Sequence, residues 1–131
     1  MKNLLAFFLF FTLFGLAGCA QQTTSQATRH VAAADAKRLI EQNPDLVLLD
    51  VRTPDEFSQG HVQGARNLDF YAPNFEQQLT ALDSTKTYLL YCASGNRSGK
   101  AAKMLEGHNF GTVYNSTAGF QELKSAGVPV K

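Results

Sequence analysis

Two short, uninterrupted apolar runs constrain the fold of this 131-residue chain more than any other feature. Residues 46–49 (LVLL) and residues 88–91 (YLLY) have the length of a β-strand but show no alternation of polar and apolar side chains. Such runs are typical of strands buried on both faces, as in parallel sheets covered by helices. The two runs therefore predict an α/β fold.

The segments around these runs extend the same pattern. Apolar residues recur every three or four positions in several of them, which indicates amphipathic helices. Thr53, Pro54 and Glu56 form a helix-start signal, in which Thr53 and Glu56 cap each other's backbone N–H groups. Alternating strands and helices predict a parallel sheet of about five strands with helices on both faces. The expected helices are residues 33–42, 53–60, 74–82, 97–106 and 120–124, and the further expected strands are residues 65–68, residues 112–114 and a short edge strand from Val31.

The charge balance excludes several classes of function. The chain has 12 Lys and Arg residues and 11 Asp and Glu residues, and one of the cations, Lys2, lies in the apolar N-terminal segment. The rest of the chain carries no net charge, which argues against a nucleic-acid partner, because neutralising phosphates requires a basic surplus. Two cysteines cannot build a disulfide scaffold. His30, His61 and His108 lack the spacing of metal ligands, so we expect no metal site.

The N-terminus has the pattern of an export signal. Lys2 precedes an apolar run at residues 4–16, which is too short to span a bilayer but has the length of the apolar core of a secretory signal. The sequence LAGC at residues 16–19 resembles a bacterial lipobox. That resemblance implies cleavage before Cys19, which then carries a diacylglyceryl and an N-acyl chain. An ordinary secretory signal with an incidental cysteine is the alternative interpretation.

The lipobox resemblance divides the chain into three parts. Residues 1–18 are the expected lipoprotein signal peptide, residues 19–30 the lipidated cysteine and a polar, flexible tether, and residues 31–131 the folded domain. Ala20, rather than an aspartate, follows the cysteine. By the sorting rules of enterobacterial lipoproteins, this favours the periplasmic side of the outer membrane over the inner membrane. Contact with the membrane is then expected through the lipid anchor alone.

A second cysteine follows the apolar run at residues 88–91 directly. Cys92 opens a loop of mainly small residues, 92–99 (CASGNRSG), that leads into an expected helix. Backbone N–H groups can point inward in such a loop, and the start of a helix adds positive potential, so the loop is a candidate anion site. We expect its thiol to have a lowered pKa and to react as a thiolate, with Arg97 as a fixed cation for an oxyanion. A cysteine simply buried in a glycine-rich turn is the alternative.

Several motifs together resemble the single-domain rhodanese sulfurtransferases. They are residues 50–57 (DVRTPDEF), residues 60–68 (GHVQGARNL), the loop at residues 92–98 (CASGNRS), and the closing pairs GF at 119–120 and GVP at 127–129. Two positions depart from the family pattern. Ala93 stands where many relatives carry a basic residue, and Leu123 stands where an aromatic residue is common.

The resemblance implies a rhodanese-like fold and transfer of a sulfane sulfur. Cys92 would attack a donor such as thiosulfate, release sulfite and pass the sulfur from a persulfide to a thiol or cyanide, without a cofactor. The acceptor would be a small thiol or a thioredoxin-like protein, and the domain is expected to be a monomer. Asp50 and Arg52 are expected to tie neighbouring loops together, and Glu56 to cap a helix rather than catalyse. The expected substrate-binding residues, acting through their N–H groups, are Ala93, Ser94, Gly95, Asn96 and Arg97.

Two other functions are open on the sequence alone. A non-catalytic persulfide carrier or anion-sensing module would have the same loop, but it would take up one sulfur and stop. Phosphatase or arsenate-reductase chemistry is less favoured. Tyrosine and dual-specificity phosphatases place five residues between their cysteine and arginine, whereas four residues separate Cys92 from Arg97. The smaller ring suits a sulfur atom better than a phosphoryl group.

Overall fold

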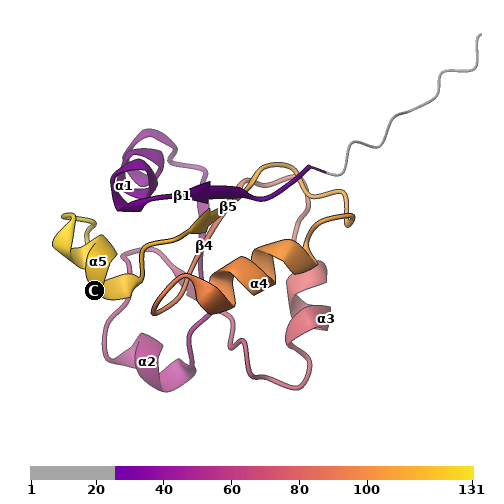
Figure 1. Ribbon diagram of the computed structural model, residues 1–131. Coiled ribbons are helices and arrows are strands. Elements are labelled where there is room, and N and C mark those ends of the chain that lie inside the picture. Colours follow the sequence, from indigo (N-terminus) through magenta and orange to yellow (C-terminus); the bar gives the residue numbers. More distant parts are fainter. Residues whose placement is uncertain (1–25) are drawn as a thin grey trace, which may run out of the picture.

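The computed structural model describes residues 26–131, which form a five-stranded parallel sheet in the order β1-β5-β4-β2-β3 (Figure 1). This is the predicted α/β architecture. The expected signal peptide and lipobox lie outside the described residues. The elements are β1 (Arg29–Val31), α1 (Ala33–Gln42), β2 (Val47–Asp50), α2 (Pro54–Ser58), β3 (Arg66–Asn67), α3 (Phe75–Thr80), β4 (Tyr88–Tyr91), α4 (Asn96–Met104), β5 (Val113–Ser116) and α5 (Phe120–Ser125).

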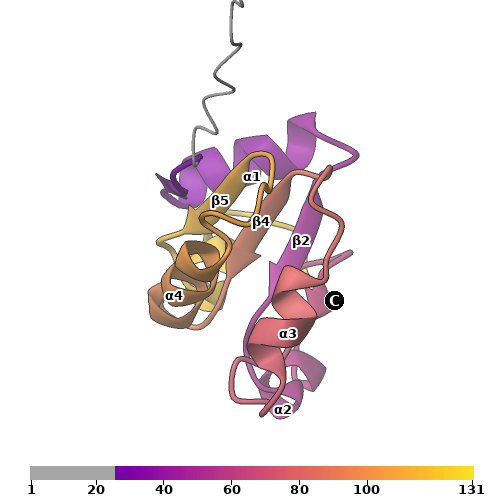
Figure 2. The ribbon, with the colours of Figure 1, turned by 90° about the vertical axis from the view of Figure 1, so that its right-hand side faces the viewer.

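Helices cover both faces of the sheet, so its central strands are buried. One apolar cluster joins α3 and α4 to the sheet, and the other joins α1 and α5 to the opposite face (Figures 1 and 2). Strand β4 lies at the centre and contributes alternate side chains to the two clusters, as a strand must. Tyr88 and Leu90 belong to the first cluster, and Leu89 and Tyr91 to the second. This double burial explains why residues 88–91 show no polar alternation.

The first strand begins earlier than the sequence predicts. Arg29 and His30 were expected in the tether, but they pair with Tyr114 and Asn115 of β5. Both side chains are exposed, so they carry no apolar signal. Backbone pairing places them in the sheet, and a hydrogen bond of 3.0 Å between Asn115 Nδ2 and His30 Nδ1 also joins the two strands. No helix within residues 26–131 is long and apolar enough to cross a membrane.

The carboxyl ends of β2 and β4 lie at one edge of the sheet, where the chain turns into α2 and α4 respectively. Ligands of open α/β sheets bind at this edge, because helix starts and flexible loops converge there. The predicted capping box begins α2: Glu56 N–H donates to Thr53 Oγ1 at 3.2 Å, and Thr53 N–H donates to Glu56 Oε2 at 2.9 Å.

Candidate active site

The Cys92 sulfur lies within a tight loop between β4 and α4. Its Sγ accepts hydrogen bonds from Gly95 N–H at 3.1 Å and from the Ser98 hydroxyl at 3.5 Å. Gly95 adopts a positive φ of 84°, which turns the chain back over the sulfur before α4 begins. Cys92 itself is fully buried. The loop therefore folds over the Cys92 sulfur with Gly95 N–H and the Ser98 hydroxyl directed at it, and anion binding by the loop stays a prediction.

The loop stabilises the thiolate form of Cys92. Burial is the largest single influence and by itself raises the pKa of the thiol, but hydrogen bonds from Ser98, Ser94 and Gly95 together outweigh it and lower the pKa below its ordinary value. These donors are the Ser98 hydroxyl and backbone N–H groups. Donors to the charged form favour that form. The sequence motif contains Ser98 but does not predict that its hydroxyl contacts the sulfur.

Two glycines let the loop pack directly against the segment that follows β5. A Cβ added to Gly119 would lie 1.8 Å from the carbonyl oxygen of Ala93, and one added to Gly95 would lie 2.7 Å from that of Thr117. Neither distance is compatible with a side chain. The N–H of Phe120 also donates to the Cys92 carbonyl at 2.9 Å. The shape of the loop therefore depends on a segment more than twenty residues away in the sequence.

The cation expected to bind an oxyanion is paired within the protein. Arg97 donates from Nη1 to Glu56 Oε2 and from Nη2 to Glu56 Oε1, each at 2.9 Å. The Arg97 guanidinium is the largest influence holding the pKa of Glu56 at about 2, and the hydrogen bonds from Thr53 add to it. Glu56 thus caps α2, as expected, and also joins α2 to α4. In this structure the Arg97 side chain is a bridge between helices rather than an uncommitted cation.

Asp50 and Arg52 form a second ion pair under the same edge of the sheet. Both are buried, and Arg52 Nε and Nη2 donate to the Asp50 carboxylate at 2.7–3.0 Å. Nη2 also donates to the Gly60 carbonyl at 2.7 Å, and the guanidinium lies 4.2 Å from the centre of the Phe120 ring. The pair holds the β2–α2 turn against the segment that follows α2. This is the loop-tying role that the sequence predicts.

The sequence matches the family model for the rhodanese-like domain over residues 32–126. The chain belongs to the rhodanese-like domain family. It is 34% identical over 88 residues to the thiosulfate:glutathione sulfurtransferase of Saccharomyces cerevisiae, a match covering 58% of this chain and 63% of that protein. It is 35% identical over 75 residues to a thiosulfate sulfurtransferase of Ectopseudomonas mendocina, covering 57% of this chain and 67% of the relative.

A solved structure agrees with the family assignment. The crystal structure of a rhodanese-related protein from Thermoplasma volcanium superimposes with a TM-score of 0.67 at 28% identity, covering 79% of this chain and 97% of that one. The fold of residues 26–131 is thus the mixed α/β rhodanese fold. The matched segment spans less than two thirds of the yeast enzyme's length.

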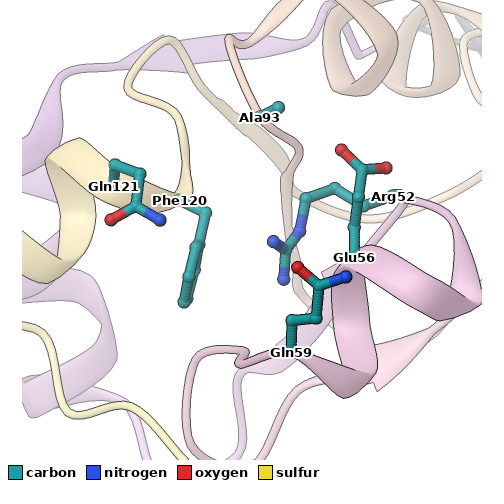
Figure 3. Close-up of a pocket in the computed structure, with 6 residues that line it drawn as sticks. All are labelled: Arg52, Glu56, Gln59, Ala93, Phe120 and Gln121. Carbon is teal, nitrogen blue, oxygen red and sulfur yellow. The ribbon is translucent and has the colours of Figure 1, made fainter.

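A pocket of about 280 Å³ opens beside the loop of this rhodanese-like domain. In Figure 3, Phe120 and Gln121 of α5 line one side, Arg52 and residues of the α2 region line the other, and Ala93 lies at the loop edge. The Arg52 guanidinium lies over the Phe120 ring, 4.2 Å from its centre, so these two side chains are in direct contact. Within residues 26–131 no group of three potential metal-ligating side chains comes together. The complete lining is Arg52, Glu56, Gln59, Ala93, Phe120 and Gln121.

Proposed function

We propose that this protein is a sulfurtransferase that moves a sulfane sulfur through a persulfide on Cys92. The observation that carries the proposal is the Cys92 sulfur, whose pKa is lowered although the residue is fully buried, because the loop donates hydrogen bonds to it. A thiolate is the reactive form of cysteine. The relatives named as thiosulfate sulfurtransferases support the same chemistry.

The transfer takes place in two displacements. The Cys92 thiolate attacks the outer sulfur of the donor, a bond forms between the two sulfur atoms, and the donor's own sulfur–sulfur or sulfur–sulfonate bond breaks with its electron pair on the leaving group. From thiosulfate the leaving group is sulfite. An acceptor thiolate or cyanide then attacks the outer sulfur of the persulfide and releases the Cys92 thiolate. Neither step requires an external oxidant or reductant.

The loop assists both displacements electrostatically. With thiosulfate as the donor, negative charge lies on Cys92 before the attack, on the outer sulfur afterwards, and again on Cys92 after release. Backbone N–H groups fixed by Gly95 and by the contact with Gly119 do not need to reorient as that charge moves. Because Cys92 has no exposed surface, side chains at the loop edge must move to admit the donor.

Mass spectrometry tests the proposal. The intact, reduced protein is treated with a sulfur donor, and its mass is measured before and after addition of cyanide. We expect a gain of one sulfur that cyanide removes, and we expect no gain in Cys92→Ser. A protein that never gains sulfur from thiosulfate or from an organic persulfide would refute the proposal.

A persulfide carrier is the second candidate, favoured by the complete burial of Cys92. A persulfide held there would be shielded from water and from unrelated thiols. Turnover separates the two functions. An enzyme forms many equivalents of thiocyanate from donor and cyanide, whereas a carrier forms one equivalent per chain and releases its sulfur only to a partner, such as a thioredoxin-like protein.

We also propose that the domain is held at the periplasmic side of the outer membrane by lipid on Cys19. The lipobox pattern at residues 16–19 supports this proposal. Cys19→Ala should then release the protein from the membrane fraction into the soluble fraction. Retention of that variant with the membranes would refute lipid anchoring at this cysteine.

A further inference from the structure

The cations of the loop and its pocket are already committed to carboxylates. Arg97 binds Glu56 through two hydrogen bonds of 2.9 Å. Arg52 binds Asp50 through bonds of 2.7–3.0 Å, and both of these residues are buried. Each pair contributes one positive and one negative charge, so the described side chains around the pocket sum to no net charge.

The edge of the loop adds no further cation. Ala93 follows the nucleophile directly and its side chain is exposed. A donor approaching Cys92 therefore meets a methyl group there. The backbone N–H groups of Ser94, Gly95 and Ser98 act on the Cys92 sulfur itself, whose pKa they lower, so a donor that meets the thiolate form of Cys92 meets a negative charge.

This arrangement does not attract a doubly charged donor. Thiosulfate brings two negative charges toward a thiolate, and it gains little from arginines whose fields are cancelled by adjacent carboxylates. A donor with little charge does not encounter that repulsion. Electrostatics at this site therefore favour a donor that carries its sulfane sulfur on an organic group.

The pocket suits such an organic group. Its walls offer the Phe120 ring for apolar contact and the side-chain amides of Gln59 and Gln121 for hydrogen bonds (Figure 3). Nη1 of Arg52 has no hydrogen-bond partner within residues 26–131 and belongs to a side chain that lines the pocket. A mixture of apolar surface and a few directed polar groups is typical of sites for small organic ligands.

We infer that the preferred sulfur donor is an organic persulfide whose non-reacting part carries little net charge and binds in the pocket beside Ala93. This inference rests on the proposed function of Cys92. In the reaction, the Cys92 thiolate attacks the outer sulfur of R–S–SH and a Cys92–sulfur bond forms. The sulfur–sulfur bond of the donor breaks, and the electron pair leaves on R–S⁻. The proton stays with the transferred sulfur, so atoms and charge balance.

The experiment compares two donors, thiosulfate and the persulfide of N-acetylcysteine amide. Rate constants for persulfide formation on Cys92 are measured by rapid quenching and intact mass, and each is divided by the rate constant of free cysteine with the same donor. Dividing by the rate constant of free cysteine corrects for the different intrinsic reactivities of the two donors. We expect the ratio to be about tenfold larger for the organic persulfide, and we expect the thiosulfate rate not to fall when salt is raised from about 20 mM to about 500 mM.

Three variants report on charge and on the pocket. Ala93→Lys should react with thiosulfate about tenfold faster than Ala93→Gln, in which a neutral side chain stands at the same exposed position. High salt should remove that gain in rate. Glu56→Gln should also react faster with thiosulfate than the wild type, because it removes the negative charge that neutralises Arg97. Gln121→Ala should raise the half-saturating concentration of the organic donor more than that of thiosulfate.

The possible failures are distinguishable. If wild-type protein reacts with thiosulfate at a rate that falls steeply with salt, the site is already cationic and the inference is wrong. It is also wrong if Ala93→Lys and Ala93→Gln react equally fast with thiosulfate, or if the corrected ratio favours thiosulfate. If Cys92 takes sulfur from neither donor, the proposed function itself is wrong.

Discussion

Replacing Ser98 with alanine tests how the loop activates Cys92. The Ser98 hydroxyl is buried and donates to the sulfur at 3.5 Å, and its side-chain hydrogen bond is the strongest of the influences that lower the pKa of the thiol, exceeded only by the opposing effect of burial. Ser98→Ala removes this donor and leaves the Gly95 N–H in place. Alanine is also a better helix former than serine, so α4 should persist.

The expected size of the effect follows from the bond. A hydrogen bond to a charged group contributes about 1.5–3 kcal/mol, and the length of this one places it near the lower figure. Losing about 1.4 kcal/mol reduces the thiolate population about tenfold at a pH where the thiol predominates. The remaining thiolate is more basic and hence more nucleophilic, which recovers about threefold. The net rate should fall about threefold at low pH and rise about threefold at high pH, where both proteins are fully ionised.

The assay is the rate of iodoacetamide alkylation of Cys92 across pH, followed by intact mass. Ser94→Ala is the matched control, because it makes the same chemical change in the same loop at an exposed side chain, and Ser94 contacts the sulfur through its backbone N–H. We expect the profiles of Ser98→Ala and Ser94→Ala to cross. Coincident profiles would refute the view that the Ser98 hydroxyl stabilises the thiolate.

Three further changes probe the framework around the loop. Gly119→Ala should displace the Ala93 carbonyl, whose oxygen would lie 1.8 Å from the new Cβ, and should slow alkylation of Cys92 about tenfold or more near neutral pH. Asp50→Ala should lower the free energy of unfolding in urea by about 3–5 kcal/mol, because it leaves Arg52 buried without its counter-ion. The pKa of Glu56 is about 2 in the folded protein against an ordinary 4.5, so its stabilising contribution is complete above about pH 4.5 and is lost as the pH falls toward 2. Glu56→Gln should lack this acid-dependent loss in urea titrations.

Matched controls distinguish these effects from general damage. Gly111→Ala places its Cβ at an ordinary 3.6 Å from the nearest atom and should leave alkylation unchanged. Asp45→Ala removes an exposed carboxylate close to the same strand and should change stability by less than about 0.5 kcal/mol. Equal losses in a variant and its control, or an unaltered acid profile in Glu56→Gln, would contradict the corresponding prediction.

Several features could be predicted because they depend on neighbouring residues. The buried run at residues 88–91 identifies a central strand, and the order Thr53, Pro54, Glu56 identifies the start of α2, which forms as predicted. Cys92 follows a buried strand and precedes a helix, which places it at the ligand-binding edge of the sheet. The fold class and the candidate nucleophile therefore follow from short-range patterns.

Other features depend on how distant segments pack. The chain contains five glutamates and five arginines, and no local pattern indicates that Glu56 pairs with Arg97, forty-one positions away. Strand β1 begins at exposed, polar Arg29 because of backbone pairing with β5, which hydropathy does not report.

The sequence by itself determined the order of strands and helices, and it placed Cys92 and the glycine-containing loop after a buried strand, because backbone preference and apolar spacing act over a few residues. Only the tertiary structure decided that the loop's arginine is neutralised by a carboxylate and that Gly119 must lack a side chain. The energy of a charge pair or a steric contact depends on the distance in space between two groups, and that distance is set by the packing of whole elements on the sheet.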